Sequence, residues 1–106
     1  MTTPEAVQEA AQRLHAARPQ ATIILFASRA RGDARPESDV DFMVVLPEAP
    51  ASPRREMVML SDLLRPLRVW ADVLVVNAQR FREAAAVPGT LHHTVAREGK
   101  VLYGSV

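Results

Sequence analysis

Residues 25–46 read LFASRARGDARPESDVDFMVVL, in which a polar loop separates two apolar runs. The first run belongs to TIILFA at residues 22–27, and the second is DVDFMVVL at residues 39–46. Both runs are short and rich in β-branched residues, which is typical of buried strands. The segment between them contains Arg, Gly, Asp and Pro, so we expect a loop there with at most one helical turn.

The rest of the chain adds helices and two further strands around this pair. Apolar residues recur at helical spacing, and capping Thr or Ser residues followed by proline mark two of the helix starts. The expected helices are residues 2–18, 52–65, 79–85 and 90–98, and the further strands are residues 68–77 and 100–103. Pro66 should end the second helix near Arg65. The sequence therefore predicts an α/β (α+β) fold, a small mixed β-sheet with helices packed against it.

Size and composition restrict the class of protein. The 106 residues fit a single domain, residues 1–106. A net charge of +1 gives no reason to expect direct binding to nucleic acid or membranes. The absence of cysteine excludes disulfides, zinc–thiolate sites and thiol nucleophiles. The apolar runs are too short to span a bilayer, and the N-terminus lacks a signal peptide, so we expect a cytoplasmic protein.

Three aspartates interrupt the apolar strands. Asp39 and Asp41 lie two residues apart and should share one strand face, about 6.6 Å apart. Asp72 interrupts the third strand and is expected to be at least partly buried, where a carboxylate must be paired, protonated or metal-bound. If the three converge, each pair repels by about 4 kcal/mol at a separation of about 4 Å, and Mg²⁺ would relieve that repulsion. Taken alone, Asp39 could equally be an ordinary cap after Ser38.

Ser28 follows the first strand at once, where its hydroxyl and backbone N–H could bind a phosphate. Arg29 and Arg31 are either solvated loop charges or further phosphate ligands. His92 and His93 are adjacent in a predicted helix and cannot share a face, so we expect them at the surface or facing a partner rather than on a metal.

This arrangement resembles the nucleotidyltransferase signature of the DNA polymerase β superfamily. That signature has a Gly-Ser pair, a spacer, Asp-x-Asp and a third Asp on a later strand. The matching positions here are Ala27-Ser28, Asp39-Val40-Asp41 and Asp72. The segment SRARGDARPESDVDF and the C-terminal PGTLHHTVAREGKVLYG resemble the minimal (MNT-type) branch in particular, and the resemblance covers nearly the whole chain.

The resemblance implies a polymerase β-like fold and a two-ion Mg²⁺ site that transfers a nucleoside monophosphate, with ATP as the expected donor. It implies that Asp39 and Asp41 hold the ions that bridge the triphosphate, and that Asp72 binds the catalytic ion and helps to deprotonate the acceptor. Ser28, with Arg29 or Arg31, would hold the terminal phosphates. Minimal members of the family commonly act as antitoxins that transfer AMP to a tyrosine of a small helical HEPN ribonuclease, so the expected partner is a HEPN-family protein.

Ala27 replaces the glycine of the family signature and leaves an alternative open. If this position needs a left-handed backbone, alanine costs about 1–2 kcal/mol. The alternative is then a catalytically weak or inactive antitoxin that neutralises its partner by binding alone. A third interpretation is transfer to RNA or to a small molecule such as an aminoglycoside, which the near-neutral charge and the lack of a second domain disfavour.

Overall fold

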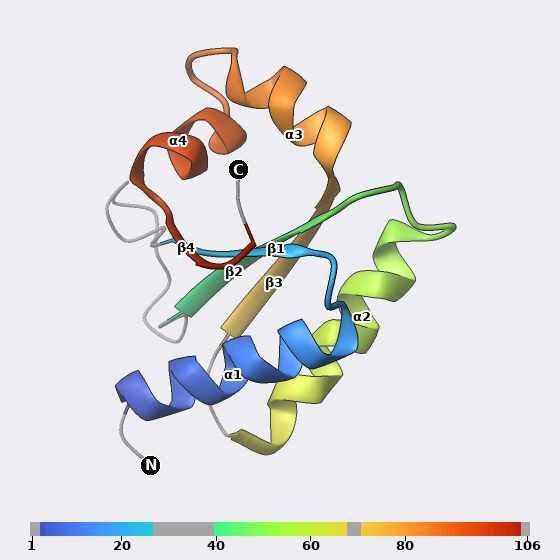
Figure 1. Ribbon diagram of the computed structural model, residues 1–106, viewed down its shortest axis with the longest axis vertical. Coiled ribbons are helices and arrows are strands. Elements are labelled where there is room, and N and C mark those ends of the chain that lie inside the picture. Colours follow the sequence, from blue (N-terminus) through green and yellow to red (C-terminus); the bar gives the residue numbers. More distant parts are fainter. Residues whose placement is uncertain (1–2, 27–39, 68–70, 105–106) are drawn as a thin grey trace.

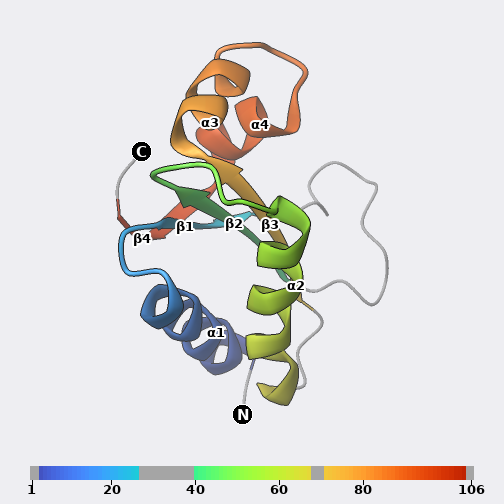
Figure 2. The same cartoon turned by 90° about the vertical axis from the view of Figure 1, so that its right-hand side faces the viewer.

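A four-stranded mixed sheet lies between two pairs of helices in the computed structural model, which describes residues 3–26, 40–67 and 71–104 (Figures 1 and 2). The elements are α1 (Thr3–Ala17), β1 (Thr22–Phe26), β2 (Val40–Leu46), α2 (Pro53–Leu64), the 3₁₀ turn η2 (Arg65–Leu67), β3 (Ala71–Asn77), α3 (Ala78–Ala85), α4 (Leu91–Glu98) and β4 (Lys100–Tyr103). The predicted fold class is therefore confirmed.

The sheet order β3-β2-β1-β4 makes β2 an inner strand. It pairs antiparallel with β1 and parallel with β3, while β4 pairs antiparallel with the other side of β1. All seven residues of β2 are buried, and helices lie on both sides of the sheet that contains this strand (Figure 2). This double covering explains why DVDFMVVL is almost continuously apolar.

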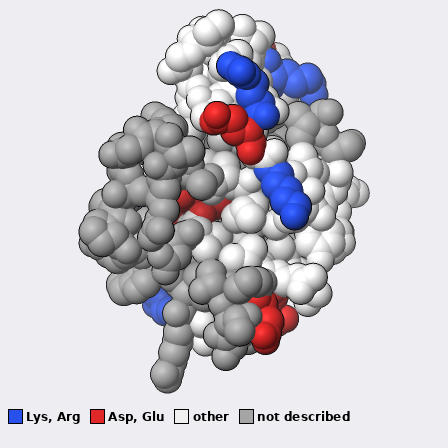
Figure 3. All heavy atoms as spheres, turned by 90° about the vertical axis from the view of Figure 1, so that its left-hand side faces the viewer, with Lys and Arg blue, Asp and Glu red and all other residues white. Residues whose placement is uncertain are grey.

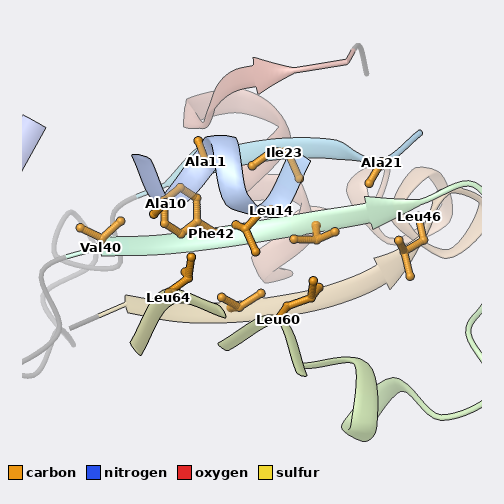
Figure 4. Close-up of a cluster of buried hydrophobic side chains, with 12 residues drawn as sticks. Ala10, Ala11, Leu14, Ala21, Ile23, Val40, Phe42, Leu46, Leu60 and Leu64 are labelled. Atoms are coloured by element: carbon orange, nitrogen blue, oxygen red, sulfur yellow. The ribbon is translucent and has the colours of Figure 1, made fainter. Parts of the chain in front are cut away.

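One face of the sheet packs against α1 and α2 (Figure 2). Phe42 and Val44 of β2 point to this side, where Leu14 of α1 and Leu60 of α2 are fully buried (Figure 4). The two helices are also joined by an ion pair, in which Arg18 donates to both carboxylate oxygens of Glu56, one of them at 2.9 Å. This partner raises the pKa of Arg18, so the pair stays charged. The α1/α2 face carries the larger core.

The opposite face packs against α3 and α4. Met43 and Val45 of β2 alternate to this side and contact a smaller core that includes Ile24, Phe81 and Val95. Gly99, between α4 and β4, allows the backbone to pass close to Ile24 of β1 and to Val95 of α4. A Cβ at this glycine would lie 2.6 Å from Ile24 Cγ2 and 2.6 Å from the carbonyl oxygen of Val95. Its φ of −72° is ordinary, so the requirement for glycine is steric and not conformational.

Local sequence signals explain the ends of α2. The Ser52 hydroxyl accepts a hydrogen bond from the backbone N–H of Arg55, and Pro53 occupies the first turn. The helix ends at Leu64 and continues as the 3₁₀ turn that contains Pro66, as predicted. Within the described ranges, every helix is too short or too polar to cross a bilayer.

Candidate active site

Two of the predicted site residues, Asp41 and Asp72, occupy the same register of neighbouring strands. Asp41 is the second residue of β2, Asp72 is the second residue of β3, and the parallel ladder pairs them directly. Adjacent strands lie about 4.8 Å apart, and paired residues project from the same face. Asp41 shares its face with Met43 and Val45, so both carboxylates belong to the α3/α4 side of the sheet.

The two carboxylates differ in burial. Asp41 is 6% exposed and is the one buried charged residue among those that the structure describes. Asp72 is exposed, so the expectation that it would be at least partly buried is wrong. The reason is its position. β3 is an outer strand of the described sheet, and Asp72 stands at its start, whereas Val76, further along the same face, is 9% exposed beneath the helices.

The carboxylates lie at the end of the sheet that α3 leaves uncovered. α3 begins directly after Asn77, at the opposite end of β3 from Asp72. On the other side of Asp41, the antiparallel ladder places Phe26, the last residue of β1, whose ring packs against the α3/α4 core. Figure 3 views this end of the molecule and shows a small acidic area beside residues that are not described. The acidic pair thus has an apolar neighbour, Phe26, on the β1 side.

The other predicted site residues lie outside the described ranges. These are Ala27, Ser28, Arg29, Arg31 and Asp39. The described chain nevertheless leaves the sheet at Phe26 and returns at Val40, and both of these residues lie next to Asp41 in the ladder or in the sequence. The segment expected to bind phosphate is therefore connected to the sheet at the end that carries the carboxylates.

Asp41 and Asp72 are suitable ligands for a hard divalent cation. Carboxylate oxygens are preferred by Mg²⁺, which commonly uses one or two of them together with water and phosphate oxygens. Within residues 3–26, 40–67 and 71–104, no set of three or more acidic or histidine side chains is arranged to hold a metal. The described part of the site is thus a pair of carboxylates, and the third predicted ligand, Asp39, falls outside it.

His92 and His93 are half-buried in α4, where both contact α3, and the prediction that they face a partner stays a prediction. The His92 ring meets Phe81 edge-on, with the ring centroids 6.1 Å apart. Burial, and then the nearby charge of Arg80, lower the pKa of His92. His93 Nδ1 lies 2.8 Å from the carbonyl oxygen of Ala85. Both histidines therefore pack α4 against α3, which begins at the opposite end of β3 from Asp72.

The sequence did not reveal Phe26 as the neighbour of Asp41, nor the direct pairing of Asp41 with Asp72. Both follow from strand register. Register depends on which strands become neighbours and in which direction they run, and short apolar runs do not encode either property. The signal that was available, a carboxylate near the start of two apolar strands, identified the residues but not their pairing.

The chain is similar to known proteins in sequence and in fold. A family model described as polymerase beta, nucleotidyltransferase matches residues 10–105. A crystal structure of a Sulfolobus solfataricus protein, whose assignment as a nucleotidyltransferase is itself provisional, has a similar fold with a TM-score of 0.57. It is 20% identical in sequence, and the alignment covers 92% of this chain and 76% of that one. Comparison with curated protein sequences gives no match.

Proposed function

Because the chain belongs to the polymerase beta nucleotidyltransferase family, we propose that it transfers AMP from ATP to a hydroxyl of a partner protein with the help of Mg²⁺. The observation that carries the proposal is the direct pairing of Asp41 with Asp72, at the end of the sheet opposite the start of α3. Two carboxylates at paired positions of strands that lie about 4.8 Å apart repel one another, and a bound divalent cation offsets that repulsion. The same residues match the carboxylates of the family signature.

In the proposed reaction, the acceptor's hydroxyl oxygen bonds to the α-phosphorus of ATP. The bond from this phosphorus to the oxygen bridging the β-phosphate breaks, and pyrophosphate leaves. Bound Mg²⁺ ions would supply positive charge against the triphosphate. Asp41, with Asp39, would hold the ions, and Ser28 would bind the terminal phosphates, aided by Arg29 or Arg31. Asp72 is exposed, so its carboxylate is accessible to accept the proton from an incoming hydroxyl.

The proposed acceptor is a tyrosine of a HEPN-family ribonuclease, which would make this chain its antitoxin in the cytoplasm. The neighbouring reading frame should then encode a small helical protein with an Arg-x₄-His-x-Tyr motif. A domain of this size has little surface with which to enclose a large acceptor, so a hetero-oligomer should complete the cleft. The support for this partner is the resemblance of the chain to the minimal branch of the family.

The experiment is transfer of label from ATP labelled in the α-phosphate to the purified neighbour, confirmed by its intact mass. Asp41→Asn should lower the transfer rate about 10²–10³-fold, the usual effect of removing one preorganised electrostatic group. Asp62→Asn is the matched control, because Asp62 is an exposed aspartate of α2 paired with Arg65, and it should not change the rate. Transfer that survives Asp41→Asn and Asp72→Asn would refute the proposal.

The competing function is neutralisation by binding alone, which Ala27 favours because it replaces the family glycine. Suppression of the neighbour's ribonuclease activity separates the two. Under adenylyl transfer, Asp41→Asn abolishes suppression although the complex still forms. Under binding alone, the same variant suppresses as well as the wild-type chain. Ala27→Gly adds a second readout, because faster transfer in that variant would identify Ala27 as a residue that limits turnover.

A further inference from the structure

A pocket of about 620 Å³ opens between α1 and β4. Most of its wall is apolar, and α1 and β4 each contribute three residues, which are Val7, Gln8 and Ala11 from the helix and Lys100, Leu102 and Tyr103 from the strand. The adjoining residue of β1, Leu25, points to the α1/α2 face and away from the carboxylates. The pocket therefore lies on the opposite face of the sheet from Asp41, and its volume is in the range of ligand sites.

A β-bulge in β4 builds this pocket. Lys100 pairs with Leu25, Val101 pairs with Ile24 and Tyr103 pairs with Ile23, so the pairing skips Leu102. In a regular strand, Leu102 and Tyr103 would point to opposite faces. The bulge brings both of them to the α1 side together with Lys100, and only Val101 points to the other face. Bulges re-aim side chains in this way beside binding sites.

A ring stack fixes the wall of the pocket. The His15 ring of α1 lies parallel to the Tyr103 ring, with an interplanar angle of 7° and centroids 4.2 Å apart. Tyr103 is therefore held in place by the helix before any ligand arrives. A wall that is already ordered loses little conformational entropy on binding, which favours affinity.

The edge of β4 adds hydrogen-bonding capacity next to the pocket. β4 is an outer strand of the described sheet, so every second residue directs its backbone N–H and C=O away from β1. Val101 is 40% exposed, and Lys100 is the one charged residue among the described residues that line the pocket. An extended peptide could thus pair with this edge, place an apolar side chain in the pocket and direct a carboxylate to Lys100.

We propose that the edge of β4 and the pocket beside it form a docking site for an extended, acidic segment of a partner protein, which adds a strand to the sheet. The exposed Lys100 favours this occupant over a second copy of the chain, because β4 itself, KVLY, carries no carboxylate that could pair with Lys100. The site lies on the opposite face from Asp41 and needs neither nucleotide nor metal. A test that refutes this docking site would therefore leave the proposal of adenylyl transfer unaffected, and the reverse also holds.

The test uses the full chain and two fluorescein-labelled peptides that differ in one residue. The acidic probe is Thr-Glu-Thr-Leu-Thr-Val-Thr, whose Glu, Leu and Val share one face when extended, and the control has Lys in place of Glu. Fluorescence anisotropy should show that the acidic probe binds at least about tenfold more tightly. Lys100→Glu should reverse this preference while binding of a fluorescent ATP analogue stays unchanged. Val7→Phe, which narrows the pocket, should weaken both peptides.

Two results would overturn the proposal. The first is absence of binding, or equal affinity for the two peptides in both the wild-type chain and Lys100→Glu. The second is a dimer of the isolated chain, seen by light scattering, that Val101→Lys dissociates, because the edge would then belong to a second copy. If Val7→Phe fails to fold by circular dichroism, the charge reversal at the exposed Lys100 still decides the question.

Discussion

The two faces of the sheet differ in the size of the hydrophobic core that they bury and in the charged residues that they carry. The α1/α2 face buries large aliphatic and aromatic side chains such as Leu14, Phe42 and Leu60, and an ion pair joins its helices. The α3/α4 face has a smaller core, and at the start of β2 and β3 it carries Asp41 and Asp72 where a core would otherwise continue. We therefore expect the first face to contribute more to stability than the second.

The largest effect on stability should come from a leucine on the α1/α2 face. Leu60→Ala removes a fully buried side chain and should lower the free energy of unfolding by about 2–5 kcal/mol. Leu91→Ala is its match on the α3/α4 face, where the side chain is only half-buried, and should cost about 1 kcal/mol. Urea denaturation measures both. If both variants lower the free energy of unfolding equally, the two faces contribute equally to stability.

Gly99→Ala tests the packing of the α3/α4 face and should destabilise by about 1–3 kcal/mol. The new methyl group would meet Ile24 Cγ2 and the Val95 carbonyl oxygen at 2.6 Å, so α4 or β4 must shift. Ala96→Ser, on the exposed side of α4, is the control and should be close to neutral. A neutral Gly99→Ala would mean that this face is loosely packed.

Glu56→Gln tests the ion pair on the α1/α2 face. The expected loss is about 1 kcal/mol or less, because the Arg18 side chain is 38% exposed and solvent screens the pair. The loss should shrink with added salt. Asp62→Asn breaks the Asp62–Arg65 pair, whose partners are 50% and 80% exposed, and should have no measurable effect. If Glu56→Gln and Asp62→Asn lower the free energy of unfolding equally, the Arg18–Glu56 pair does not stabilise the packing of α1 against α2.

The smallest predicted effect is a change in how stability depends on pH, caused by His92 on the α3/α4 face. Burial and Arg80 lower the pKa of His92 from 6.5, so the unfolded chain binds the proton first as the pH falls. The stability contributed by the neutral ring is complete above pH 6.5 and is lost as the pH falls toward the lower pKa of the folded state. His92→Gln should reduce the fall in thermal midpoint across this range, relative to wild type. An unchanged pH profile in His92→Gln would exclude His92 as the cause.

Much of the fold was predictable because it is locally encoded. All four described strands lie within the predicted ranges, since β-branched runs bounded by polar or proline-containing segments leave few alternatives. Ser52, Pro53 and Pro66 likewise specify the ends of α2 through capping and the missing proline N–H. The burial of Asp72 was mispredicted, because an apolar run does not show whether a strand is inner or outer.

The sequence by itself determined the elements, the fold class and the identity of the carboxylates, because caps, periodicity and an acidic residue within an apolar strand are local signals. The tertiary structure alone decided that Asp41 is buried and Asp72 exposed, and that the two face each other across a parallel ladder. It also decided that a bulge in β4 turns Leu102 and Tyr103 to one side. Strand order and register arise from contacts between distant segments, and these long-range contacts are not encoded by any single stretch of the chain.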